Sequence, residues 1–136
     1  MRQEDKITEK SSLYHHLESK SVGELLEDIN REDHKVADAV KEALPQIEAL
    51  VVEAEKRMKR GGRVFYIGAG TSGRLGVLDA SELPPTFGVP STLVSGLIAG
   101  GDTALRNAVE NAEDMTAQGW ADLQKFEPTA DDTLIG

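Results

Sequence analysis

The sequence of 136 residues contains no cysteine. Disulfide bonds, thiolate-bound zinc or iron–sulfur centres and a cysteine nucleophile are therefore excluded for this chain. Aromatic residues make up only 4% of the sequence, which disfavours the stacking platforms that bind single-stranded nucleic acid. The length corresponds to about one domain.

Basic residues and long apolar runs are also scarce. The chain has 15 basic and 24 acidic side chains and a net charge of −9, so it lacks the positive field that attracts nucleic acid. No apolar run reaches the roughly 18 residues that a membrane helix needs, and Met1–Asp5 is not the apolar core of a signal peptide. We therefore expect a soluble cytoplasmic protein that binds neither nucleic acid nor a membrane.

The first 60 residues fall into two parts. Residues 1–20 are polar without a clear period and are expected to form an N-terminal arm. Residues 21–60 are expected to form N-terminal helices. Ser21 and Glu24 have the spacing of a capping box, which predicts a short helix that ends near Asn30.

A long amphipathic stretch follows. Apolar residues recur every three or four positions from Val36 to Met58, which is the spacing of one helix face. Pro45 interrupts this pattern. Because proline costs about 3 kcal/mol inside a helix, we expect a kink or a break there. Gly61 and Gly62 are expected to end the helical region.

From residue 61 the sequence alternates between strands and helices. Val64–Ile67 is an almost wholly apolar run, typical of a buried parallel strand. Further strands are predicted at Thr92–Val94 and Thr133–Ile135. The predicted helices cover Arg74 to about Ser81, ending before Pro84-Pro85; Thr103–Asn111, with Asp102 as N-cap; and Asp114–Lys125.

This order of elements predicts an α/β fold, with an open parallel sheet that is flanked by helices and preceded by the N-terminal helices. Ligand-binding loops of such sheets lie just beyond the carboxyl ends of the strands. The chain ends at Gly136, directly behind a strand. We therefore expect residues 61–136 to be the first part of an incomplete domain.

A glycine-rich loop follows the first strand. Gly68, Gly70 and Gly73 match G-x-G-x-x-G, the pattern of dinucleotide-binding folds. That function also needs an acidic residue about 20 positions later, and no Asp or Glu lies between Leu83 and Gly101. No lysine follows the glycines, so the loop is not a Walker A motif, and the G-x-S-x-G spacing is absent.

A single phosphate fits this loop better. Successive backbone N–H groups can form an anion-binding nest, and two hydroxyl side chains stand at the predicted helix start. The candidate phosphate-binding residues are Gly70, Thr71, Ser72 and Gly73. The alternative is a tight strand-to-helix turn that binds nothing.

The loop and its surroundings resemble the N-acetylmuramic acid 6-phosphate etherases, a family in the sugar isomerase (SIS) superfamily. The resemblance covers nearly the whole chain. It is carried by Gly68-Ala69-Gly70-Thr71-Ser72-Gly73-Arg74-Leu75-Gly76, Asp79-Ala80-Ser81-Glu82, Pro84-Pro85-Thr86-Phe87-Gly88, Gly96-Leu97-Ile98-Ala99-Gly100-Gly101 and Ala108-Val109-Glu110-Asn111-Ala112-Glu113-Asp114. Upstream it includes Ile7-Thr8-Glu9, Ile29-Asn30-Arg31-Glu32-Asp33 and Ala43-Leu44-Pro45-Gln46-Ile47.

The resemblance implies a lyase that uses no metal or organic cofactor. Such enzymes cleave the D-lactyl ether of N-acetylmuramic acid 6-phosphate to N-acetylglucosamine 6-phosphate and D-lactate, by elimination and hydration, in cell-wall sugar recycling. The family's acid falls on Glu82 and its base on Glu113. We expect burial or a like charge to raise the pKa of Glu82, because a leaving alkoxide needs a proton. The resemblance also implies a homodimer.

Family members are about twice as long as this chain, and the segment that follows in them is a second Ser/Gly-rich sugar-binding loop. Two alternatives remain open: a non-catalytic phosphosugar-binding regulator and a sugar-phosphate isomerase. Arg74 is expected either at the phosphate or in a subunit contact. His34 is expected to be a surface helix residue, and Leu83 stands where relatives often have cysteine.

Overall fold

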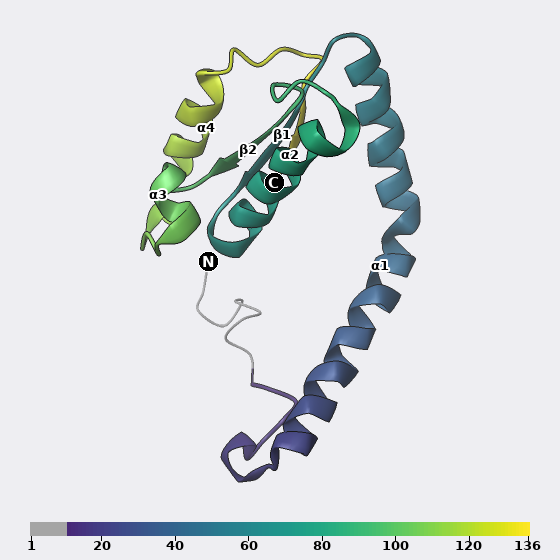
Figure 1. Ribbon diagram of the computed structural model, residues 1–136, viewed down its shortest axis with the longest axis vertical. Coiled ribbons are helices and arrows are strands. Elements are labelled where there is room, and N and C mark those ends of the chain that lie inside the picture. Colours follow the sequence, from purple (N-terminus) through teal and green to yellow (C-terminus); the bar gives the residue numbers. More distant parts are fainter. Residues whose placement is uncertain (1–10) are drawn as a thin grey trace. The chain divides into compact units, whose positions relative to one another are not determined.

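The computed structural model describes residues 11–136, apart from the side chains of Glu113 and Thr116. The chain divides into two compact units, one ending at Ile47 and one running from Glu48 to Gly136, and each is described by itself. The Ile7-Thr8-Glu9 motif and the first half of the expected arm lie outside the described residues. The elements in chain order, shown in Figure 1, are η3 (Leu17–Ser19), α1 (Val22–Lys59), β1 (Val64–Gly68), α2 (Gly70–Phe87), β2 (Val94–Ile98), α3 (Gly101–Arg106), η4 (Ala112–Asp114), α4 (Thr116–Gln124) and β3 (Thr133–Ile135).

The start of α1 confirms the predicted capping box. The Ser21 backbone N–H donates to Glu24 Oε2 at 2.8 Å, and the Glu24 N–H donates to Ser21 Oγ at 3.3 Å. These two bonds satisfy backbone donors that a helix start leaves free. Just before the helix, Lys20 forms an ion pair with Asp28, so this segment is tied to the second turn of α1.

The predicted division of residues 21–60 into separate helices is wrong, because α1 is a single helix that contains Pro45. Pro45 cannot donate to the carbonyl of Lys41, but both residues are exposed, so solvent can hydrate the free carbonyl. The predicted end is confirmed. The helix stops at Lys59, and Gly61 has the left-handed φ of 95°.

The three strands form a parallel sheet in the order β2-β1-β3, as the alternation of elements predicts. Val64 of β1 pairs with Val94 of β2 on one side and with Thr133 of β3 on the other. The second strand begins and ends later than predicted. It pairs with β1 as far as Gly68↔Ile98, so the ladder continues beyond the most β-branched part of the sequence.

The central strand is covered on both faces. On one face Val64 and Val94 pack with Ala80 of α2. On the other, the fully buried ring of Phe65 meets Phe126 edge-to-face at 5.4 Å, close to the end of α4. Adjacent strand residues point to opposite faces, which explains why Val64–Ile67 is a continuous apolar run.

Glycines allow α2 to lie unusually close to the sheet. A Cβ on Gly76 would lie 2.7 Å from Tyr66 Cβ, and one on Gly96 would lie 2.6 Å from Val77 Cα. Both contacts are too short for real atoms, so these two positions require glycine. The start of α2 is thereby fixed at the end of β1.

The predicted end of α2 near Ser81 is wrong, since the helix continues through Pro84 and Pro85 to Phe87. Prolines cannot donate hydrogen bonds, but their φ is compatible with a last helical turn. That turn is closed by Gly88, whose φ is 66° and whose N–H donates to the Pro84 carbonyl at 2.9 Å. A C-terminal glycine therefore outweighs the two prolines.

The next helix also differs from its prediction. It covers only Gly101–Arg106, and its N-cap is Gly100 with φ 87°, while Asp102 lies in the first turn. Asn107 is already extended. The predicted helix Asp114–Lys125 and strand Thr133–Ile135 are confirmed by α4 and β3.

Candidate phosphosugar site

The candidate site begins where β1 ends and α2 starts. The Gly68 carbonyl accepts a hydrogen bond from Ala99 N–H at 2.9 Å, which ties this loop to the end of β2. Gly70 then takes a left-handed φ of 55°, which turns the chain directly into the helix. The strand, the turn and the helix N-terminus occupy consecutive residues, the arrangement of known anion-binding loops.

Three backbone donors are available at this helix start. The N–H groups of Gly70, Thr71 and Ser72 have no acceptor within the helix, and the N-cap residue is alanine, whose side chain cannot cap them. The first turn contains no acidic residue, and Thr71 and Ser72 are exposed. The positive end of the helix dipole is therefore open to an anion.

Gly73 has a different role from the other loop residues. Its N–H donates to the Ala69 carbonyl at 3.2 Å, inside the first helical turn, so it is not one of the open donors. A Cβ there would lie 2.7 Å from Ile98 Cγ1 and 2.8 Å from the Gly68 oxygen. Gly73 is buried and allows the helix start to approach both strands.

One cavity, of about 310 Å³, lies on the α2 side of the loop. Ser72 and Asp79 line it from α2, Tyr66 lines it from β1, and Gly136 lines it from just beyond β3. The sheet order 2-1-3 places the reversal of winding between β1 and β3, where open α/β sheets bind ligands. Burial raises the pKa of the Tyr66 hydroxyl, and the Asp79 carboxylate raises it further.

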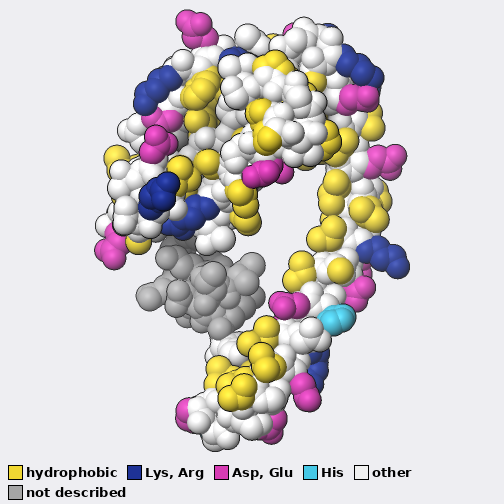
Figure 2. Space-filling model, viewed as in Figure 1, with side chains coloured by type: hydrophobic (Ala, Val, Ile, Leu, Met, Phe, Trp, Pro, Cys, Tyr) yellow, Lys and Arg dark blue, Asp and Glu magenta, His cyan; other side chains and the backbone are white. Residues whose placement is uncertain are grey.

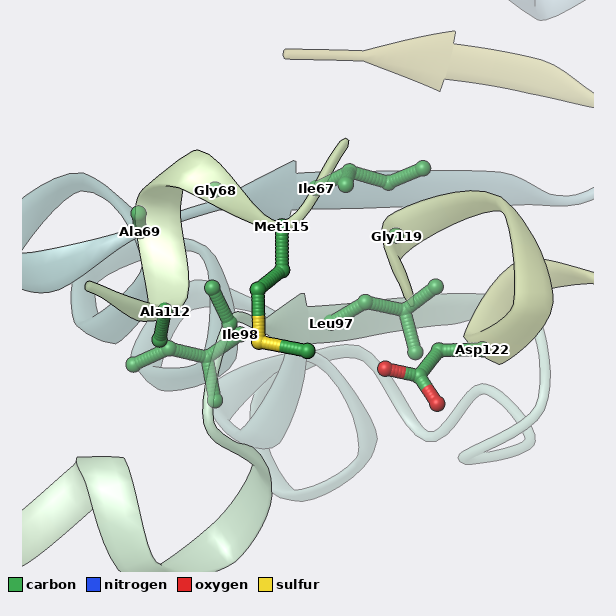
Figure 3. Close-up of a pocket in the computed structure, with 10 residues that line it drawn as sticks. Ile67, Gly68, Ala69, Leu97, Ile98, Ala112, Met115, Gly119 and Asp122 are labelled. Carbon is green, nitrogen blue, oxygen red and sulfur yellow. The ribbon is translucent and has the colours of Figure 1, made fainter. Parts of the chain in front are cut away.

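A second cavity, of about 320 Å³, lies on the α4 side and is shown in Figure 3. Its wall is mostly apolar. In the figure the Met115 side chain extends toward Leu97 and Ile98, and the Asp122 carboxylate faces the same space. Hydrogen bonds from Lys125 and Gln118 hold the pKa of Asp122 below its usual range, so this carboxylate is charged.

Glu113, the predicted base, has its backbone beside the glycine loop. It belongs to η4, and its neighbour Ala112 lines both the α4-side cavity and a further cavity of about 240 Å³ together with Ala69. Asn111, at φ 61°, makes the turn that leads into η4. The fold therefore brings the segment of residue 113 to the carboxyl ends of β1 and β2.

Glu82, the predicted acid, is not brought to the loop within one chain. It is exposed on α2, ten residues beyond Ser72, which corresponds to about 15 Å along the helix. It does not line the cavity that Ser72 lines. The burial that was expected for this side chain is therefore absent from this chain, because the helix carries Glu82 away from the sheet.

Arg74 was expected either at the phosphate or in a subunit contact, and within this chain its guanidinium donates to two backbone carbonyls. Its Nε donates to the Leu105 carbonyl at 3.2 Å and its Nη2 to the Asn107 carbonyl at 3.4 Å. It therefore ties α2 to the end of α3. His34 is confirmed as a surface helix residue: it is exposed, and its Nδ1 lies 2.7 Å from the Asn30 carbonyl oxygen.

The contact of Tyr66 with Asp79 was not recognised from the sequence. Two regularities point to it: Tyr66 alternates with Phe65 and so faces α2, and Asp79 follows Ser72 by seven residues, two turns along the same helix face. Metal binding has no comparable basis. Among the described side chains of residues 11–136, which do not include that of Glu113, no group of three or more acidic or histidine side chains could hold an ion.

An open parallel sheet with a glycine-rich loop and an uncapped helix start after its first strand is an α/β arrangement of the kind that can bind phosphorylated ligands. The chain belongs to the family of the glucokinase regulatory protein N-terminal SIS domain, whose family model matches residues 44–136. This match covers the second compact unit and the last residues of the first.

Several curated relatives are similar to nearly the whole chain, and each is named N-acetylmuramic acid 6-phosphate etherase. The relative from Bacteroides thetaiotaomicron is 67% identical over 131 residues, which are 96% of this chain and 47% of the relative. The one from Porphyromonas gingivalis is 64% identical over 97% of this chain and 48% of its own length. The one from Christiangramia forsetii is 60% identical over 100% of this chain and 50% of its own length. The chain thus spans about half the length of the curated relatives it matches.

Proposed function

We propose that this chain is part of a carbon–oxygen lyase that cleaves the D-lactyl ether of N-acetylmuramic acid 6-phosphate. The products would be N-acetylglucosamine 6-phosphate and D-lactate, and the reaction would serve cell-wall sugar recycling in the cytoplasm. The observation that carries the proposal is the convergence of the glycine loop and the segment Ala112–Asp114 at the carboxyl ends of β1 and β2. The names of the relatives support this choice of substrate.

The proposed phosphate site consists of the start of α2. The open N–H groups of Gly70, Thr71 and Ser72 would donate to the 6-phosphate, and the two hydroxyls would add further donors. Gly73 contributes by allowing the helix to approach β2. We assign the domain boundary accordingly, with residues 61–136 as the first part of the phosphosugar-binding domain, residues 21–60 as an N-terminal helical segment that contains α1, and residues 1–20 as an arm.

The proposed chemistry is an elimination followed by addition of water. Glu113 would remove the C2 proton of the open-chain sugar, and Glu82 would protonate the departing lactate oxygen at C3. This division of roles requires two carboxyl groups with different environments. No metal or organic cofactor takes part in the proposed route.

We also propose that the active enzyme is a homodimer. Glu82 is exposed and about 15 Å of helix away from Ser72, which supports a site that is completed at a subunit contact. Such a contact would also supply the burial that a general acid needs to hold its proton near neutral pH.

Proton NMR in D₂O tests the function directly. The chain is incubated with N-acetylmuramic acid 6-phosphate, and free lactate together with deuterium at C2 is the expected result. Glu113→Gln should abolish deuterium entry, because no base remains at that position. Asp114→Asn is the matched control, since this exposed neighbour should retain activity within about twofold. Deuterium entry without lactate release would instead identify an isomerase.

A phosphosugar-binding regulator is the second candidate, because the matching family model is named for a regulatory protein. A regulator would bind N-acetylglucosamine 6-phosphate without turning over the ether substrate. A regulator would also retain its affinity for N-acetylglucosamine 6-phosphate in Glu113→Gln, whereas an enzyme would lose its rate of lactate release.

A further inference from the structure

Arg74 is the basic residue closest in sequence to the glycine loop, but its guanidinium is directed to backbone carbonyls. It donates to Leu105 O and to Asn107 O, at the end of α3 and just beyond it. The other basic residues of this half include Arg63, paired with Asp132, and Lys125, paired with Asp122. Arg74 instead satisfies the last carbonyls of a short helix, where a cation also complements the helix dipole.

The connection that Arg74 holds leads directly to Glu113. After α3 the chain runs through Asn107 and Val109 to Asn111 and η4. Val109 packs closely against Gly100, which follows β2. A Cβ added to Gly100 would lie only 3.0 Å from the Val109 Cβ, so the connection contacts the chain just beyond β2. Arg74 lines the same cavity as Ala69, Gly70 and Ala112. One side chain therefore links the first turns of the phosphate-loop helix to the segment that carries residue 113.

We propose that Arg74 is a positioning residue, which fixes the connection from α3 to η4 against the glycine loop and thereby sets the place of residue 113. The fork of the guanidinium suits this task, because two donors in one plane hold two carbonyls, two residues apart, at once. Its consequence for proton transfer rests on the proposed function, whereas its effect on the connection does not.

Hydrogen–deuterium exchange of the chain tests this positioning. Arg74→Met keeps the aliphatic stem and removes both donors, so amide exchange between Arg106 and Asp114 should accelerate about tenfold. Exchange in β1 and β2 should be unchanged. Arg74→Lys retains one donor and the charge, and should restore part of the protection. Arg106→Met is the control, since it removes an equal charge from an exposed position in the same segment.

Binding of inorganic phosphate separates positioning from direct contact. The Kd measured by NMR titration should change less than threefold in Arg74→Met. Unchanged exchange combined with a tenfold weaker Kd would overturn the proposal and make Arg74 a phosphate ligand. Exchange that accelerates equally in Arg106→Met would also overturn it, because the effect would then be one of charge.

Turnover kinetics distinguish a positioning residue from a purely structural one, because only the former should change kcat without changing KM. With N-acetylmuramic acid 6-phosphate as substrate, Arg74→Met should lower kcat more than tenfold, leave KM within threefold, and recover partly in Arg74→Lys. An equal loss in KM and kcat would contradict positioning of the base. If the unsubstituted chain releases no lactate, the proposed function fails for this chain, and the exchange experiment still decides whether Arg74 holds the connection.

Discussion

Asp132 shows how one carboxylate can join two neighbouring strands of a sheet. It is buried just before β3 and accepts hydrogen bonds from the Arg63 N–H at 2.7 Å, from Arg63 Nη2 at 2.8 Å and from the Thr129 N–H at 2.8 Å. Arg63 immediately precedes β1, so the pair fixes the chain entries to two neighbouring strands. These hydrogen bonds and the guanidinium charge hold the pKa of Asp132 far below its ordinary value of 3.8.

Asp132→Asn should therefore lower the free energy of unfolding by about 3 kcal/mol, because it leaves a partly buried guanidinium without its counter-charge. Urea denaturation measures this loss. Asp131→Asn is the matched control: its ion pair with Arg60 is exposed, and the change should stay within about 0.5 kcal/mol. Because the folded pKa of Asp132 is the lower one, its contribution is complete above about pH 4 and falls as the pH drops toward the folded value. The difference between Asp132→Asn and the unsubstituted chain should shrink accordingly in acid.

Gly73 belongs to the glycine loop and also packs against both strands, so a substitution there affects the stability of the fold. Gly73→Ala would place a Cβ against Ile98 and the Gly68 carbonyl, at separations under 3 Å. We expect a loss of about 2–3 kcal/mol, typical of overpacking. Gly119→Ala is the control, because a Cβ there would meet only Ile67 Cγ2 at 4.0 Å and alanine favours the helix. Thermal unfolding distinguishes the two, and equal Tm values would contradict the packing role of Gly73.

At the scale of elements, the stability of α1 draws on its capped first turn. Pro45 removes one hydrogen bond from the interior of this helix, so the capping bonds at its start matter more. Ser21→Ala removes the acceptor of the Glu24 N–H and should cost about 1 kcal/mol. Exchange of the amides Val22–Leu25 should accelerate about fivefold. Ser81→Ala makes the same substitution inside α2, where the hydroxyl only donates back to the Leu78 carbonyl, and should leave stability within about 0.5 kcal/mol. Equal effects of the two changes would argue against the capping box.

The elements that could be predicted are those whose pattern is local. The capping box, the apolar run of β1 and the strand Thr133–Ile135 each follow from a few neighbouring residues. The end of α2 and the start of α3 could not be predicted, because Gly88 and Gly100 override the prolines and Asp102 through left-handed turns. At the site, the loop was predictable from its glycines. The distance of Glu82 from the loop and the partners of Arg74 depend on the tertiary arrangement, which no local pattern contains.

On the scale of the whole molecule, the chain combines a net charge of −9 with a row of exposed apolar side chains on α1. Figure 2 shows hydrophobic side chains following this helix on the face in view. In the first unit the row consists of Val36, Val40, Leu44 and Ile47, with 62%, 47%, 52% and 41% of their surfaces exposed. Net charge of one sign opposes non-specific association, and the exposed apolar row is a surface on which a specific contact between two copies could form.

The proposed homodimer can be tested through this row. The chain should sediment as a dimer, and Leu44→Glu should shift it toward the monomer by at least tenfold in Kd, because a charge would replace a half-exposed apolar side chain in the contact. Gln46→Glu adds the same charge about 200° around the helix, where no contact is expected, and should leave the Kd within threefold. Lactate release should fall with the dimer in Leu44→Glu and return at high protein concentration if Glu82 acts across a subunit contact. A monomer with full activity would contradict both the dimer and the completion of the site by a second copy, and would require Glu82 to reach the sugar within one chain.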